Sequence, residues 1–305
     1  MILALEQILN GAQLGLMLFL LAAGLTLVFG IMNLVNLAHG SLYMMGAYFA
    51  VTLIDWTGSF VLGALLALPA VLLLGIAVEV ICLRRLYARS HLDQLLATFG
   101  LLLFFNDLVL VIWGKAGRTI ALPGWLRTSV EILPGVPYSA YRLLVIAAGL
   151  VVALGLWFTI SRTRIGMRIR AGASDREITG ALGIDVASLF SLVFGVGAML
   201  AGLAGILNAP ILTVQSGMGE RILVIALVVT VLGGIGSVRG AFVAALSIGL
   251  LDTLARAFLP DLLKVVLPAS AAQTAGAAAG SMIIYLLMVI TLAVRPQGLF
   301  PVRAR

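Results

Sequence analysis

Apolar runs of about 20 residues recur along the whole chain and constrain its fold more than any other feature. They lie near residues 8–30, 36–54, 60–83, 94–113, 141–160, 188–208, 221–236, 238–257 and 276–294. A helix of that length crosses a hydrocarbon core of about 30 Å. Hydrophobic residues make up 62% of the 305-residue chain and charged residues only 10%, which excludes an ordinary soluble domain. The sequence therefore predicts an all-α, polytopic membrane protein with about 8–9 apolar spans in a single domain, 1–305.

The positions of the basic residues predict which side of each span faces the cytoplasm. Arginines gather in three places that the order of spans puts on one side: residues 84–89, the 161–187 segment, and the tail with Arg295, Arg303 and Arg305. An excess of Lys and Arg marks the cytoplasmic side, so the 114–140 loop lies outside. Because these residues sit at span ends rather than in one patch, the net charge of +7 does not indicate nucleic acid. The N-terminus lies outside if 31–56 crosses fully, and inside if it is re-entrant.

Two stretches interrupt the helical pattern at membrane depth. The first runs from Gly30 to Ser41 and the second from Gly233 to Gly240. Irregular backbone persists in a bilayer only where protein buries it or where it lines a wet cavity. Broken or re-entrant helices of this kind often line a solute path. The candidates for such a path are Asn33, Asn36, His39, Ser41, Gly234 and Gly236. The alternative is that the polar side chains only satisfy backbone groups freed at a helix break.

Small residues spaced one helical turn apart predict close helix packing. Examples are Gly11 with Gly15, Gly197 with Ala201 and Gly205, and Gly276 with Gly280. In lipid such residues let helix backbones approach each other. We expect this packing inside the chain, although contact with a second membrane subunit would use the same chemistry.

The arginine-rich segment 161–187 predicts a docking element. Ser174 and Glu177 have the spacing of a capping box, which would start a short helix. That helix would carry Ile178 and Leu182 on one face, and Gly183 would end it. A short amphipathic helix on the basic side of a membrane protein suggests a surface for a cytoplasmic partner.

Ionisable residues within the spans argue against ion-coupled transport. Glu79 lies close to Arg84, and Asp252 precedes Arg256 by four residues, which suits an ion pair on one helix face. Asp107 alone has no basic neighbour, whereas a proton relay needs several unpaired acids. The chain also lacks a phosphate-binding loop, a metal-ligand cluster and a catalytic motif. We therefore expect no enzyme activity, cofactor or metal site on this chain.

Several segments together resemble the LivH-type permease of branched-chain amino acid ABC importers. They are 24–32, 36–40, 45–48, 166–171, 183–184, 202–205, 233–237 and 295–300. The resemblance implies a type II ABC importer-like fold in the bacterial inner (plasma) membrane. It also implies a translocation subunit for branched-chain or other small apolar amino acids. Related systems import urea, amides or small carboxylates, and an ion-coupled secondary transporter is the alternative from another class.

The resemblance further implies partners and the residues that meet them. The partners are a LivM-type second permease or a second copy of the chain, two cytoplasmic ATPase subunits that carry ATP and Mg, and a periplasmic solute-binding protein. The 161–187 segment would receive the ATPase through Gly166, Arg168, Arg170, Ser174, Asp175, Glu177, Ile178, Leu182, Gly183 and Ile184. The family commonly has alanines where this chain has Ile178, Thr179 and Gly180. Because a central glycine costs about 1 kcal/mol in a helix, the docking helix is expected to be less rigid.

Overall fold

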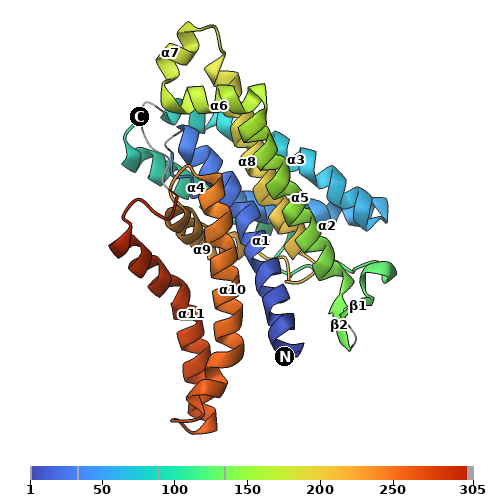
Figure 1. The fold of residues 1–305 in the computed structure, drawn as a ribbon. Coiled ribbons are helices and arrows are strands. Elements are labelled where there is room, and N and C mark those ends of the chain that lie inside the picture. Colours follow the sequence, from blue (N-terminus) through green and yellow to red (C-terminus); the bar gives the residue numbers. More distant parts are fainter. Residues whose placement is uncertain (1, 33, 88, 134, 301–305) are drawn as a thin grey trace.

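In the computed structural model each predicted apolar run is a helix (Figure 1). The structure describes residues 2–32, 34–87, 89–133 and 135–300, so Asn33, Arg303 and Arg305 lie outside the described residues. The long helices are α1 (Ile2–Met32), α2 (His39–Thr57), α3 (Phe60–Ile81), α4 (His91–Trp113), α5 (Ala140–Arg162), α8 (Val186–Asn208), α9 (Met218–Gly233), α10 (Val238–Leu263) and α11 (Ala269–Val294). Within the described ranges, 7 helices are long and apolar enough to cross a membrane, and α2 and α9 are not among them.

The shorter elements lie at the two ends of the helix bundle. They are η1 (Leu83–Leu86), η2 (Gly124–Leu126), β1 (Ser129–Leu133), β2 (Val136–Ser139), α6 (Arg164–Ser174) and α7 (Arg176–Ala181). The antiparallel hairpin β1–β2 corrects the purely helical prediction, with Ser129 opposite Ser139 and Val130 opposite Tyr138. Alternating Val130 and Ile132, followed by Gly135 at φ 82°, are the local signal for this hairpin.

Helix α1 is the central element of the bundle. It packs against α5, α8, α9 and α10, and its side chains from Leu16 to Val28 are buried. A Cβ atom added to Gly15 would lie 2.9 Å from the carbonyl oxygen of Ala245 in α10, and one on Gly24 would lie 2.5 Å from that of Gly197 in α8. The predicted close packing inside the chain is therefore confirmed for these helices.

The predicted small residues on α8 and α11 also lie at close contacts between helices. Gly205 of α8 lies against the backbone of Tyr43 in α2. On α11, Gly276 and Gly280 face Pro260 and Arg256 of α10. These contacts bring α2 close to α8 and α11 close to α10.

The N-terminus lies at the end of the bundle opposite α6 and α7 (Figure 1). Near the start of α1, Asn10 accepts a 3.1 Å hydrogen bond from the Tyr138 hydroxyl of the outer hairpin. At the other end, Arg176 of α7 donates a 2.7 Å hydrogen bond to the carbonyl of Met32. Since the arginine-rich segment is predicted to be cytoplasmic, this arrangement predicts that the N-terminus is outside.

The first break returns the chain into the protein before α2 begins. His39, the first residue of α2, lies beside Leu21 and Gly24, well back along α1. Helix α2 then continues towards the outer side, where Asp55 pairs with Arg118 of the outer loop at 3.6 Å. The segment therefore combines a re-entrant start with a return to the outer face.

The second break lies next to the first. Helix α9 ends at Gly233, three residues earlier than the predicted span, because Gly234 (φ 99°) and Gly236 (φ 80°) leave the helical conformation. Ser237 then caps α10 by accepting a 3.1 Å hydrogen bond from the N–H of Gly240. A Cβ on Gly30 would lie 2.7 Å from the Cα of Gly236, so the two breaks touch where α1 ends.

We predict that Gly46→Ala destabilises the chain. Its new Cβ would lie 2.4 Å from the Cα of Gly202, and neither backbone can yield without moving a whole helix. Overpacking of this kind costs about 1–3 kcal/mol. The measurement is the midpoint of thermal aggregation in mild detergent. Gly155→Ala is the matched control, since nothing lies within 4 Å of a Cβ there. An equal midpoint for both variants would contradict the packing argument.

Candidate functional site

The predicted docking segment forms two consecutive helices that project beyond the bundle (Figure 1). Thr163 begins α6 by accepting a 3.2 Å hydrogen bond from the N–H of Gly166. Gly166 packs against the end of α5, where an added Cβ would lie 2.3 Å from the carbonyl oxygen of Ile160. The close approach therefore requires glycine at this position.

The start of α7 differs from the prediction. Ser174 is the last residue of α6, and Asp175 caps α7 by accepting a 2.9 Å hydrogen bond from the N–H of Ile178. Asp175 has an extended backbone (φ −152°, ψ 115°), which separates the two helices and makes it the capping residue. The prediction that Ser174 and Glu177 form a capping box is therefore wrong. Gly183 does end the segment as predicted, with φ 83°.

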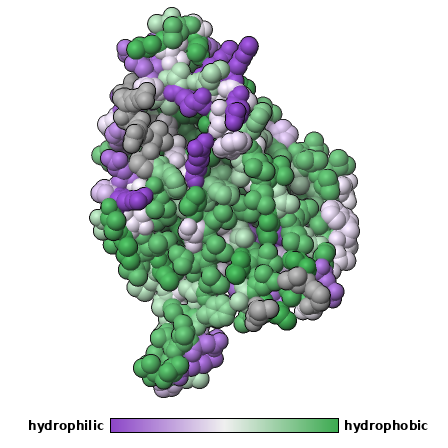
Figure 2. Space-filling model, viewed as in Figure 1, coloured by the Kyte–Doolittle hydropathy of each residue, from purple (hydrophilic) through white to green (hydrophobic). Residues whose placement is uncertain are grey.

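The predicted apolar face of α7 is exposed. Ile178 is 60% and Leu182 is 76% exposed, and Ala181 beside them is exposed as well. Hydrophilic side chains surround this end of the molecule, above a body that is mostly hydrophobic (Figure 2). The remaining predicted docking residues are exposed or partly exposed, except Gly166: Arg168, Arg170, Ser174, Asp175, Glu177, Gly183 and Ile184.

Arg176 joins this segment to the bundle. Its guanidinium donates to the carbonyls of Ile31 (3.2 Å) and Met32 (2.7 Å) at the end of α1. It also lies 4.8 Å from the ring centroid of Phe190 in α8, a cation–π distance. The sequence places Arg176 in the segment, but only the fold brings it to the free carbonyls at the C-terminus of α1.

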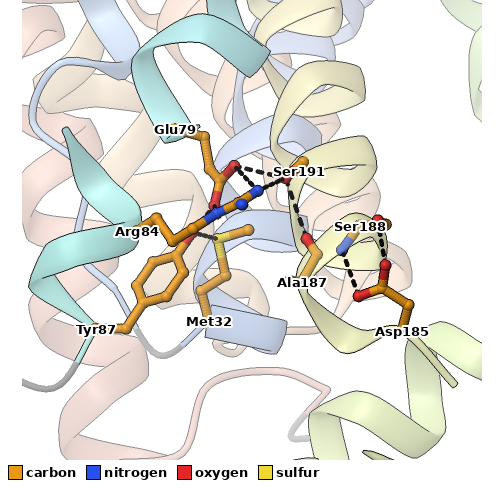
Figure 3. Close-up of polar contacts among 8 residues, drawn as sticks. All are labelled: Met32, Glu79, Arg84, Tyr87, Asp185, Ala187, Ser188 and Ser191. Carbon is orange, nitrogen blue, oxygen red and sulfur yellow. Dashed lines mark hydrogen bonds and ion pairs between the residues drawn. The ribbon is translucent and has the colours of Figure 1, made fainter. Parts of the chain in front are cut away.

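A buried carboxylate holds the adjoining ends of α3 and α8 (Figure 3). Glu79 accepts hydrogen bonds from Arg84 (3.2 Å), the hydroxyl of Tyr87 (2.7 Å) and the hydroxyl of Ser191 (2.6 Å). The predicted pairing of Glu79 with Arg84 is confirmed, while the contribution of Ser191 was missed because it lies more than a hundred residues away in sequence. A buried charge is stable only when paired and hydrogen-bonded, as here.

Two ionisable groups beside this carboxylate have shifted pKa values. Burial raises the pKa of the Tyr87 phenol, and its hydrogen bond to Glu79 raises it further, so Tyr87 remains a donor. Hydrogen bonds from the Ser188 hydroxyl and backbone N–H lower the pKa of Asp185, which caps α8. At neutral pH the Tyr87 phenol therefore stays neutral and the Asp185 carboxylate stays ionised, and in these states they support the ends of α3 and α8.

The predicted path residues near α2 lie in the protein interior. His39 Nε2 is 3.1 Å from the carbonyl oxygen of Leu21, and Asn36 Oδ1 accepts a 3.0 Å hydrogen bond from the N–H of Ala38. Among the described residues, Asn36 Nδ2, His39 Nδ1 and Ser41 Oγ are buried without a hydrogen-bond partner. Buried polar groups normally find partners, so these three atoms stand out. Their role in a solute path stays a prediction.

The glycines of the second break have different surroundings. Gly236 lines a cavity of about 1300 Å³ near the ends of α1 and α5, together with Gly30. Gly234 instead packs against Phe300, which follows α11, and the N–H of Phe300 donates a 3.0 Å hydrogen bond to the carbonyl of Gly233. The cavity does not reach Asn36, His39 or Ser41, so the fold separates the two groups of path candidates.

A polar cluster that the sequence did not predict joins α4 and α9. Asn106 donates a hydrogen bond to the carboxylate of Glu220, and the Ser216 hydroxyl donates to the Asn106 carbonyl at 3.0 Å. Asp107, next to them on α4, is exposed. The predicted Asp252–Arg256 pair is confirmed at 2.8 Å. Within the described ranges, no group of three or more His, Cys, Asp or Glu residues could hold a metal ion.

Comparisons with known proteins agree with this architecture. The family model described as branched-chain amino acid transport system / permease component matches residues 7–292. The high-affinity branched-chain amino acid transport system permease protein BraD of Pseudomonas aeruginosa is 32% identical over 81% of this chain and 85% of its own length. The permease protein LivH of Escherichia coli is 28% identical over 97% of this chain and 94% of its own length.

A more distant relative belongs to another import system. The ribose import permease protein RbsC of Escherichia coli is 26% identical over 76% of this chain and 72% of its own length. No solved structure matches the chain. The family match over nearly the whole chain and the set of apolar helices lead to one assignment. The chain belongs to the branched-chain amino acid permease family and is a multi-pass inner-membrane subunit of an ABC importer.

Proposed function

We propose that this chain carries branched-chain amino acids across the membrane while separate cytoplasmic subunits bind ATP and Mg and hydrolyse the ATP. The similarity to BraD and LivH, both named as high-affinity branched-chain amino acid permeases, carries the proposal. A sugar is the second candidate substrate, favoured by the similarity to RbsC. Membership of an ABC importer family leaves no support for the ion-coupled alternative.

The polar groups near α2 and α9 support an amino acid over a sugar. The two helix starts touch, because a Cβ on Gly219 would lie 2.1 Å from the carbonyl oxygen of Gly40. Helix N-termini carry partial positive charge and favour an anionic group such as a carboxylate. The unpartnered Ser41 Oγ and His39 Nδ1 lie next to this contact. We propose that the path passes here, with the substrate carboxylate near the two helix starts.

Uptake in cells tests the substrate. We expect deletion of this chain to abolish high-affinity uptake of labelled leucine, isoleucine and valine, with ribose, urea and short amides unaffected. Uptake should return with the wild-type chain supplied from a plasmid. Loss of ribose uptake with intact leucine uptake would instead favour a sugar as the substrate. Loss of urea or amide uptake alone would favour the related importers of urea and amides.

The exposed face of α7 supports an ATPase docking site. Ile178 and Leu182 expose apolar surface that no described part of the chain covers, while Arg176 joins the helix to α1 and α8. Exposed apolar side chains flanked by charges mark a protein contact. Because the Arg176 contact lies at the end of α1, we propose that movement of the ATPase reaches the touching breaks at Gly30 and Gly236 through α7.

A double substitution tests this surface. Ile178→Ser with Leu182→Ser should lower ATPase co-purification with the tagged chain by at least about tenfold, because two central apolar contacts are lost. The matched control is Val265→Ser with Val266→Ser, since those side chains are 84% and 82% exposed between α10 and α11, at the outer end. Equal recovery of ATPase from both variants would contradict docking at α7.

The surface of α4 supports a second permease subunit. At 1.5 Å per residue, Asp107 lies about 24 Å along the helix from His91, inside the span. A carboxylate facing lipid costs about 2.5–3.5 kcal/mol at the centre of a span and less nearer its end, where Asp107 lies. Leu103 and Phe104 are exposed on the same face, and Glu220 of α9 is exposed nearby. We propose that a LivM-type permease covers this face, with the path beside it.

Photo-crosslinking tests this interface. A benzoylphenylalanine placed at Leu103, which is 47% exposed, should crosslink to a second permease in native membranes, with the adduct identified by mass spectrometry. The control is the same residue at Val289 of α11, 59% exposed, where we expect no such adduct. An adduct with another copy of this chain would show self-pairing. Only lipid adducts at Leu103 would contradict the interface.

A further inference from the structure

A crevice between α5 and α10 has two chemically different ends. Its volume is about 1300 Å³, larger than the roughly 300–1,000 Å³ pockets that hold small ligands. The floor is α1, which packs against both flanking helices. The membrane-facing part is lined by apolar side chains from all three helices: Phe19, Leu27, Leu154, Trp157, Phe242 and Val243. Leu154 and Trp157 are exposed, so the crevice opens sideways from the bundle.

The cytoplasmic end of the same crevice is lined by four arginines: Arg89, Arg170, Arg176 and Arg239. Among the described residues that line the cavity there is no Asp or Glu. None of the four arginines forms an ion pair within the described ranges. Arg170 and Arg176 donate to backbone carbonyls, whereas the exposed guanidiniums of Arg89 and Arg239 have no hydrogen-bond partner in the described part of the chain. The described residues therefore supply no counter-charge to the arginines at this end.

The two ends together select one class of ligand. A soluble anion would neutralise the arginines and leave the apolar crevice empty. A neutral lipid would fill the crevice and leave four guanidiniums without a counter-charge. A phospholipid with an anionic headgroup satisfies both ends, since basic pockets at the cytoplasmic ends of spans suit such headgroups. Hydrophilic side chains border the apolar body on this face of the molecule (Figure 2).

We propose that the crevice between α5 and α10 binds an anionic phospholipid of the inner leaflet. Its phosphate lies among Arg89, Arg170, Arg176 and Arg239, where guanidinium groups can hold it bidentately. One acyl chain runs along α1 between Leu154 and Phe242. Because Arg176 also binds the end of α1, the headgroup sits beside the docking segment and stabilises its position.

Lipid retention tests the proposal, which does not depend on the transported substrate. The full-length chain, purified with its accompanying subunits, is titrated with phosphatidylglycerol or phosphatidylcholine in mixed micelles. Bound lipid is counted by native mass spectrometry. We expect phosphatidylglycerol to be retained in preference, and Arg89→Gln with Arg239→Gln to weaken it about tenfold. Arg85→Gln with Arg295→Gln is the matched control, because both are exposed arginines near the cytoplasmic ends of spans, outside the crevice.

A substitution in the apolar part separates a lipid from a free anion. Ala153→Trp adds a large side chain to the lining of the crevice and leaves all four arginines in the sequence, so it should reduce phosphatidylglycerol binding as well. Three results would overturn the proposal: equal retention of both lipids, thermal stabilisation by inorganic phosphate that matches phosphatidylglycerol, or displacement of the lipid by leucine. The last result would assign the crevice to the transport path.

Discussion

The fold depends on the close approach of α1 to the helices around it. In lipid the tails outside a helix are as apolar as its neighbours, so association relies on van der Waals contact between closely spaced backbones. Glycines supply that contact along the length of α1: Gly15 at α10, Gly24 at α8, and Gly30 at the second break. Each of these approaches leaves no room for a Cβ. The central helix thereby fixes where both chain breaks lie and which end of the bundle carries α6 and α7.

The same helix connects the cytoplasmic surface with the interior of the bundle. Arg176 binds the free carbonyls at the end of α1, and the Glu79 cluster holds the neighbouring ends of α3 and α8 together. Arg176 thus connects α7 directly to α1 and α8. The start of α2 lies further inside, beside α9, with polar atoms that have no partner in the described part of the chain. The exposed apolar face of α7 and the polar atoms at the start of α2 are therefore linked through α1.

Local sequence signals predicted much of this correctly, and their failures have specific causes. Apolar run length located the helices, and Gly183 ended the docking segment as expected. The capping prediction failed because Ser174 and Asp175 are both good caps, and the extension of α6 through Ser174 decided between them. The hairpin was missed because its strands are short and follow a loop with turn signals only. Ser191 could not be linked to Glu79 from spacing, since the two meet only after α3 and α8 pack.

The sequence by itself determined the membrane class and the family, because these follow from apolar length and local motifs. The tertiary structure alone decided that the N-terminus lies at the end of the bundle opposite the arginine-rich segment, and it decided the surroundings of each polar residue within the bundle. His39 is enclosed, whereas Asp107 is exposed, although both interrupt apolar stretches in a similar way. The physical reason is that a helix in lipid is apolar on every side. Its sequence therefore carries little information about which face meets protein and which meets the membrane.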